Sequence, residues 1–253
     1  MCGRVALRAL IWDVDGTLAD TERDGHRVAF NAAFAESGPP FRGWHWSVAE
    51  YGRWLAVPGG KERVLAAWQK VDPVGAARPD AMPRVATLHA AKTGHYRRLI
   101  RCGAVQLRPG VERLLREARR DGVLLAIATT TTPANVDALL RHTLGDASPG
   151  WFACIAAGDV VARKKPAPDI HRHVLAELQL APVQAVALED SAVGAAAAIG
   201  AGVPTIVVRN DFTRDDAIDR TPQLLADVGG FDDLTLPALR ALHAGAAMTV
   251  RRH

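Results

Sequence analysis

The chain has 253 residues, of which 49 % are hydrophobic and 23 % are charged, and its formal net charge is +4. This length and apolar content allow a large buried core, so a disordered chain is excluded. The arginines are scattered rather than clustered, and no apolar run approaches the roughly 18 residues of a membrane-spanning helix, so we expect neither nucleic acid nor a membrane as a partner.

Five short runs rich in apolar and β-branched residues are each followed by a longer segment with helical spacing. Near-continuous apolar runs are typical of the strands of a parallel sheet that helices cover on both faces. The sequence therefore predicts an α/β fold with a doubly wound parallel sheet. The predicted strands span residues 6–13, 123–129, 154–158, 185–190 and 204–209.

About 110 residues separate the first predicted strand from the second, several times the usual length of such a connection. Residues 24–101 contain segments with apolar residues at three-to-four spacing, which favours helices. This indicates an inserted α-helical cap domain over residues 19–102, with residues 1–18 and 103–253 forming the core. Four tryptophans are expected in the interior of the cap rather than on a surface that stacks bases: Trp44, Trp46, Trp54 and Trp68.

Polar side chains stand at the carboxyl ends of four predicted strands. In an open parallel sheet, ligands bind beyond this edge. Two pairs of carboxylates gathered there would repel each other, and the usual remedy is a bound hard cation. A site built of oxygen ligands fits Mg²⁺ best. The residues are Asp13 and Asp15 after the first strand, Thr129 ending the second, Lys164 and Lys165 after the third, and Glu189 and Asp190 ending the fourth.

These residues carry a resemblance over essentially the whole chain. DVDGT at 13–17, the strand-end Thr129, Lys165 followed by Pro166, and the pair Glu189 and Asp190 match in order the four motifs of the haloacid dehalogenase-like (HAD) hydrolase superfamily. The resemblance implies a Rossmann-like HAD core. The insert resembles the helical cap of the phosphoglucomutase and phosphoglycolate phosphatase branch.

The resemblance implies a Mg²⁺-dependent phosphatase that works through an aspartyl-phosphate. Asp13 would be the nucleophile, and Asp15 the general acid and base. Thr129 and the adjoining Thr130 would hold phosphoryl oxygens, while Lys165 would neutralise charge on the phosphoryl group. The implied metal ligands are Asp13, Asp15 through its backbone carbonyl, Glu189 and Asp190.

Further stretches, among them DTERDGHRVAFN at 20–31 and AVPGGKER at 56–63, resemble the CbbY-type sugar phosphatases associated with carbon fixation. Members of that group remove a phosphate from xylulose 1,5-bisphosphate, which implies a sugar bisphosphate as substrate here. Asp20 stands where these phosphatases often have glutamate. The expected substrate contacts are Lys61 and Arg63 for the second phosphate, and Asp20, His26 and Tyr51 for the sugar hydroxyls.

Other interpretations stay open at this point. A β-phosphoglucomutase-type isomerase, or another sugar-phosphate or phosphoglycolate phosphatase, would use the same two aspartates. A dehalogenase needs neither a leaving-group acid nor Mg²⁺, and a silent binding protein would have lost a motif acid. Lys61 and Arg63 are equally consistent with solvated surface charges, and Lys164 with a solvated neighbour of Lys165.

The expected partner is thus a small sugar phosphate or bisphosphate, bound by a monomer. The three cysteines show no metal-type spacing, which favours the reducing environment of the cytoplasm.

Overall fold

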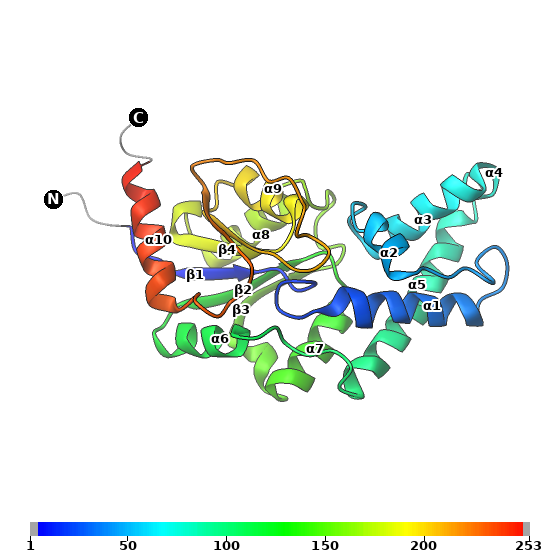
Figure 1. Cartoon of the computed structure of the whole chain (residues 1–253), viewed down its shortest axis with the longest axis horizontal. Helices are drawn as coiled ribbons and strands as arrows, with labels where there is room; N and C mark the ends of the chain where they lie inside the picture. The colour runs from blue at the N-terminus through cyan, green and yellow to red at the C-terminus, as the bar shows by residue number, and fades with distance from the viewer. Residues whose placement is uncertain (1–4, 250–253) are drawn as a thin grey trace.

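The computed structural model describes residues 5–249. Its core is a six-stranded sheet in the order β3-β2-β1-β4-β5-β6, in which every neighbouring pair is parallel (Figure 1). This confirms the predicted doubly wound parallel sheet. The strands are β1 (Ala9–Trp12), β2 (Leu124–Thr129), β3 (Phe152–Ala157), β4 (Ala185–Glu189), β5 (Thr205–Val208) and β6 (Leu224–Val228).

Helices cover both faces of this sheet: α6 (Val111–Arg120), α7 (Pro133–Leu144) and α10 (Leu236–Thr249) on one, and α8 (Asp169–Leu178) and α9 (Ala192–Gly200) on the other. Two short 3-10 helices, η2 (Ser148–Trp151) and η3 (Pro182–Gln184), precede β3 and β4. Along β1, Leu10 and Trp12 pack with the first group, whereas Ala9 and Ile11 pack with the second. Because successive side chains of a strand point to opposite faces, a strand covered on both sides is apolar throughout.

The sixth strand, β6, is absent from the five that the sequence predicts. Its sequence LLADV includes Asp227, and none of its residues is fully buried. It pairs with β5 at the edge of the sheet. An edge strand that is partly exposed lacks the continuous apolar run by which the other strands are recognised.

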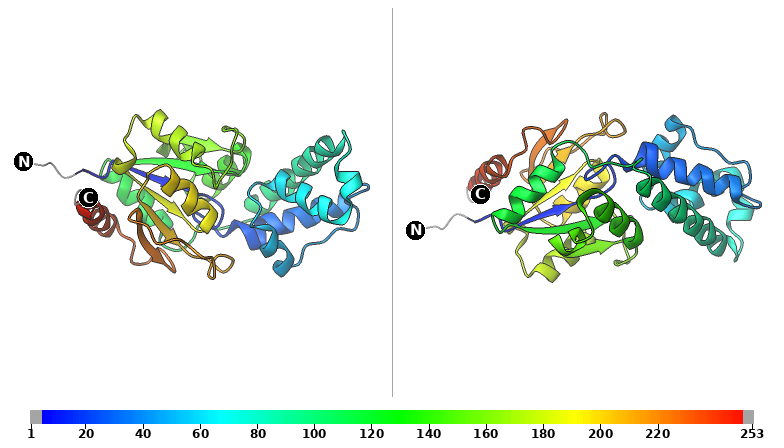
Figure 2. Two further views of the ribbon diagram at one scale, coloured as in Figure 1. Left: turned by 90° about the horizontal axis from the view of Figure 1, so that it is seen from above. Right: turned by 90° about the horizontal axis from the view of Figure 1, so that it is seen from below.

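Between β1 and β2 the chain forms helices, as the spacing predicts. Besides α6, which belongs to the core, they are the helices of the insert: η1 (Glu22–His26), α1 (Arg27–Glu36), α2 (Val48–Trp54), α3 (Gly60–Val71), α4 (Pro73–Ala76) and α5 (Ala81–Arg101). The helices of the insert lie together beyond one end of the sheet (Figure 2), and α1 to α5 share an apolar cluster of their own. Trp46 and Trp68 are buried in this cluster, and Trp44 and Trp54 pack against it.

Two connections join this insert to the core, and they run side by side. The amide of Arg108 donates to the carbonyl of Leu18 at 2.9 Å, and Ala19 forms a β-bridge with Leu107. The proposed division into a core of residues 1–18 and 103–253 and a cap of residues 19–102 places its boundaries at or near these connections. Within the described residues, no helix is long and apolar enough to cross a membrane.

Candidate active site

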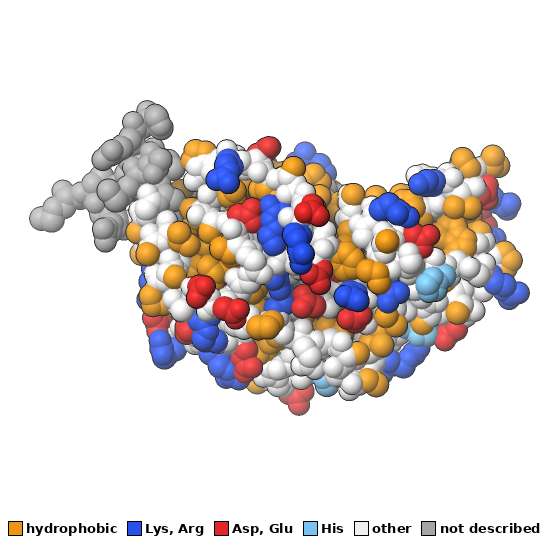
Figure 3. Space-filling view, viewed as in Figure 1, with side chains coloured by type: hydrophobic (Ala, Val, Ile, Leu, Met, Phe, Trp, Pro, Cys, Tyr) orange, Lys and Arg blue, Asp and Glu red, His pale blue; other side chains and the backbone are white. Residues whose placement is uncertain are grey.

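The carboxyl edge of the sheet and the helical insert together line a cavity of about 420 Å³. Acidic and basic side chains gather in the middle of this side of the molecule, where the core meets the insert (Figure 3). The cavity brings together eight residues that the sequence analysis singled out: Asp13, Asp15, Arg63, Thr129, Thr130, Lys165, Glu189 and Asp190.

Lys165 is the positive centre of this cavity. Its Nζ atom donates to Oδ1 of Asp13 at 2.8 Å and to Oε1 and Oε2 of Glu189 at 2.7 and 3.0 Å. Burial alone would lower the pKa of Lys165, but these two carboxylates raise it above its usual range. Lys165 therefore stays charged and is placed to neutralise negative charge beside Asp13.

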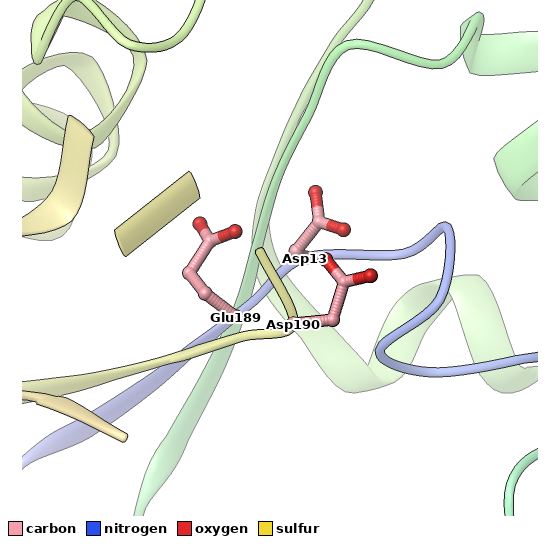
Figure 4. Close-up of side chains that lie close together, drawn as sticks. All are labelled: Asp13, Glu189 and Asp190. Carbon is pink, nitrogen blue, oxygen red and sulfur yellow. The ribbon is translucent and has the colours of Figure 1, made fainter. Parts of the chain in front are cut away.

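Three carboxylates meet at the ends of β1 and β4 (Figure 4). Asp13, Glu189 and Asp190 each offer one oxygen, and these atoms lie within 4.8 Å of one another. Burial raises the pKa of Asp13 to about 7, with Lys165 opposing the rise and Glu189 and Asp15 adding to it. The cluster thus holds more negative charge than Lys165 alone can balance.

Asp190 has the least compensated charge of the three. Burial and the nearby charges of Asp13 and Glu189 raise its pKa well above the usual range. Among residues 5–249, its carboxylate receives one hydrogen bond, from Asn210 at 2.6 Å, and has no ion pair. A buried carboxylate without a counter-charge is costly, so this oxygen-rich site fits a hard divalent cation such as Mg²⁺.

The Asp15 carboxylate lines the same cavity but is hydrogen-bonded to side chains of the insert. It accepts hydrogen bonds from Thr21 Oγ1 at 2.7 Å and from His26 Nε2 at 2.7 Å. Lys92 Nζ donates to the other ring nitrogen of His26 at 2.7 Å, which leaves Nε2–H as the donor to Asp15. Although burial opposes it, these partners lower the pKa of Asp15 to about 2. Because the insert holds Oδ1 of Asp15, the predicted metal contact of this residue through its backbone carbonyl stays a prediction.

The wall opposite the carboxylates comes from the insert. Arg63, on α3, is buried and lines the cavity; its Nη1 donates to the Tyr51 hydroxyl at 2.7 Å and its Nε to the carbonyl of Trp54 at 3.1 Å. The Tyr51 hydroxyl in turn donates to Glu22, which lies 3.8 Å from Arg63. This arrangement holds a guanidinium on the cap side of the same cavity.

Thr129 and Thr130 form the floor at the end of β2. Thr129 is 1 % exposed, and its hydroxyl accepts from the amide of Thr131 at 3.3 Å. Hydroxyl and amide groups of this kind bind phosphoryl oxygens without adding charge.

Residues 7–202 match the family described as haloacid dehalogenase-like hydrolase. The chain belongs to this family. The membership confirms the predicted family and the predicted enzyme class, a HAD-type phosphatase, because the four motifs of the family coincide with the cavity just described.

This HAD hydrolase is similar to several CbbY proteins. It is 47 % identical over 223 residues to the plasmid CbbY of Cupriavidus necator, covering 88 % of this chain and 86 % of that protein. It is 44 % identical over 237 residues to CbbY of Cereibacter sphaeroides, covering 92 % and 98 %. The structure of CbbY from Rhodobacter sphaeroides with phosphate has a TM-score of 0.81 at 42 % identity, over 92 % of this chain and 99 % of that one.

A second structure of that Rhodobacter protein is an Asp-to-Asn variant in complex with xylulose 1,5-bisphosphate. It gives a TM-score of 0.82 at 42 % identity over the same shares of the two chains. A β-phosphoglucomutase from Clostridium difficile, at 18 % identity and a TM-score of 0.76, shares the fold.

The structure places all three predicted sugar contacts of this HAD enzyme outside the lining of the cavity. Tyr51 is fully buried, and its hydroxyl is bonded to Arg63 and Glu22. The Asp20 side chain is 67 % exposed, lies 3.7 Å from Arg108 and lines a different cavity. His26 is buried behind Asp15, because Asp15 and Lys92 occupy both of its ring nitrogens. Glu22, two residues after Asp20, is the acid that reaches the cavity, and sequence reasoning missed it. The available signal was the second acid of the DTERDGH stretch, at the start of η1.

The contacts of Lys61 and Lys164 also differ from those that the sequence analysis predicts. Lys61 does not reach the cavity with Arg63 but pairs with Asp159, which follows β3. Lys164 is not a solvated neighbour of Lys165: its side chain is 15 % exposed and contacts Glu62 at 2.5 Å and Asp159 at 3.0 Å. Each lysine pairs with an acid on the other side of the boundary between insert and core, Lys61 with Asp159 and Lys164 with Glu62. These partners are about 100 residues away in the chain, so the sequence near each lysine does not indicate them.

Proposed function

We propose that this HAD hydrolase is a Mg²⁺-dependent phosphatase that removes one phosphate from a small sugar bisphosphate, with xylulose 1,5-bisphosphate as the substrate. The observation that carries the proposal is a cavity with phosphoryl-transfer groups on one wall and the buried Arg63 on the other. A bisphosphate has an anion at each end, and a buried guanidinium can grip the end that does not react. The similarity to CbbY proteins, one of them bound to this bisphosphate, supports the choice.

In the first step, a carboxylate oxygen of Asp13 forms a bond to phosphorus, and the bond from phosphorus to the sugar oxygen breaks. Asp15, which is ionised in the free protein, takes up a proton when the anionic substrate binds and passes it to the departing oxygen, so that Asp15 ends this step ionised. Lys165, 2.8 Å from Asp13, offsets negative charge on the phosphoryl group and on the nucleophile.

In the second step, water attacks the aspartyl-phosphate, Asp15 takes the proton from that water, and the Asp13 carboxylate leaves. The lowered pKa of Asp15 keeps it in the base form that this step needs. Asp13, Glu189, Asp190 and the carbonyl of Asp15 would hold Mg²⁺, which when bound supplies positive charge next to the phosphoryl oxygens.

A phosphate-release screen over pentose and hexose mono- and bisphosphates tests the proposal. We expect one phosphate to be released per xylulose 1,5-bisphosphate, with the product xylulose 5-phosphate, and we expect EDTA to abolish the release. Isomerisation of a hexose 1-phosphate without phosphate release from any bisphosphate would instead identify a mutase. Full activity in EDTA would contradict the metal requirement.

A further inference from the structure

One amide side chain outside the four HAD motifs contacts the carboxylate cluster. Asn210 follows β5, and its Nδ2 donates to Oδ2 of Asp190 at 2.6 Å and to the carbonyl of Gly16 at 3.3 Å. It thus links a carboxylate at the end of β4 to the loop that follows β1. Nothing in the sequence analysis singled out this residue.

The orientation of this amide is fixed by its other end. Oδ1 of Asn210 accepts from the amides of Phe212 and Thr213 at 2.9 and 3.2 Å. A flipped side chain would turn NH₂ toward those two donors and an oxygen toward the Asp190 carboxylate, losing every one of these hydrogen bonds. The NH₂ group therefore has to face Asp190.

The segment that carries Asn210, residues 210–216, is itself held in place. Arg209 Nη1 donates to the carbonyls of Thr213 and Asp216 at 2.6 and 2.7 Å. The same guanidinium pairs with Asp227 on β6 at 2.8 Å, and Asp216 accepts from the amide of Ala192 at 3.0 Å. These four contacts leave the segment that carries the amide little freedom to move.

The hydrogen-bonded pair of Asp190 and Asn210 is packed tightly against Gly16. A Cβ at Gly16 would lie 2.2 Å from Oδ2 of Asp190 and 2.5 Å from Nδ2 of Asn210, and its φ is +82°. The hydrogen-bonded pair therefore occupies the space beside this glycine, and the Asp190 carboxylate cannot rotate freely on that side.

We infer that Asn210 is a positioning residue that fixes the Asp190 carboxylate in the orientation in which it binds a divalent cation. One oxygen of Asp190 is held by the amide, and the other is left for the metal. A neutral donor suits this task, because a cation at the same place would compete with the metal for the carboxylate. The inference rests on the proposed function, in which Asp190 is a Mg²⁺ ligand.

The test is a calorimetric titration of the substrate-free full-length protein with Mg²⁺. Asn210→Ala removes the whole amide. Asn210→Asp keeps an oxygen that accepts from Phe212 and Thr213 but removes the donor to Asp190. We expect both variants to bind Mg²⁺ about 10- to 100-fold more weakly, the usual effect of losing a partner of a metal ligand. Asp211→Asn, on a side chain that is 74 % exposed, is the matched control and should bind like wild type.

Thermal unfolding without Mg²⁺ separates positioning from a structural role. If Asn210 only builds the turn, Asn210→Asp restores both the melting temperature and the Mg²⁺ affinity, and the inference is overturned. Affinities of both variants within twofold of wild type also overturn it. Wild-type protein that binds no Mg²⁺ would instead refute the proposed function, so the two failures are distinguishable.

Discussion

Nζ of Lys164 lies 2.5 Å from Oε1 of Glu62, and this contact joins the core to the insert beside Gly59, which lines the active-site cavity. Lys164 also lies 3.0 Å from Asp159, and Asp159 pairs with Lys61 of the insert. Two lysines and two acids thus alternate in sign across the boundary between the two parts. Such a network favours the closed arrangement in which insert and core share one cavity.

Breaking this network should weaken substrate capture. Partly exposed ion pairs contribute about 0.2–1 kcal/mol each, so Glu62→Gln and Lys164→Met should each lower kcat/KM about two- to fivefold at low salt. The double variant should lose less than the product of the two effects, and the differences should fade near 1 M salt. Arg84→Met, which breaks the 2.7 Å pair with Asp80 inside the insert, is the control. A loss of kcat/KM that does not change with salt concentration would contradict a role of these ion pairs in substrate capture.

Replacing Asp13 by asparagine should abolish turnover while the fold is kept. The amide is nearly the same size but a poor nucleophile, and it removes the ion pair with Lys165. We would measure phosphate release and search for a phosphorylated protein by mass spectrometry. We expect a phosphoryl group on Asp13 of the wild type and none on the variant. Phosphate release by Asp13→Asn at the wild-type rate would show that another residue is the nucleophile.

Asp15 should affect both rate and pH-dependent stability. Asp15→Ala removes a positioned acid and base and should slow turnover by about 10²- to 10⁴-fold. Burial opposes the shift, but the electrostatic effect and hydrogen bond of His26 and the hydrogen bond of Thr21 lower the pKa of Asp15 to about 2, against 3.8 in the unfolded chain. The ionised form therefore stabilises the fold above pH 3.8.

That stabilisation is lost as the pH falls from about 4 to about 2. The unfolding free energy of wild type minus that of Asp15→Asn should therefore shrink by about 2 kcal/mol over this interval. Urea denaturation at several pH values measures it. A difference that stays constant with pH would show that Asp15 is not held in its charged form.

The core of the site was predictable because it is local. Asp13 and Asp15, or Glu189 and Asp190, are neighbours in sequence, and the apolar strands before them determine that all four reach one edge of the sheet. The contacts made by the insert were not predictable in the same way. Whether Glu22 or Asp20 faces the cavity depends on the turn into η1. The direction of the Lys61 side chain depends on Asp159, which is 98 residues away.

Arg63 and Lys61 provide the test of substrate choice. Arg63 is buried and lines the cavity, whereas Lys61 pairs with Asp159 outside it. Arg63→Met should therefore raise KM for xylulose 1,5-bisphosphate about 10- to 100-fold, the worth of a charge-assisted hydrogen-bonded pair of roughly 1.5–3 kcal/mol. It should change KM for monophosphates much less.

Lys61→Met should change both classes of substrate by the same small factor, because it acts only through the boundary between insert and core. Steady-state kinetics on the bisphosphate and on a matched monophosphate give the comparison, with circular dichroism to show that Arg63→Met is folded. Equal losses on both substrates for Arg63→Met would mean that the guanidinium shapes the cavity wall through Tyr51 and Glu22 rather than binding the second phosphate.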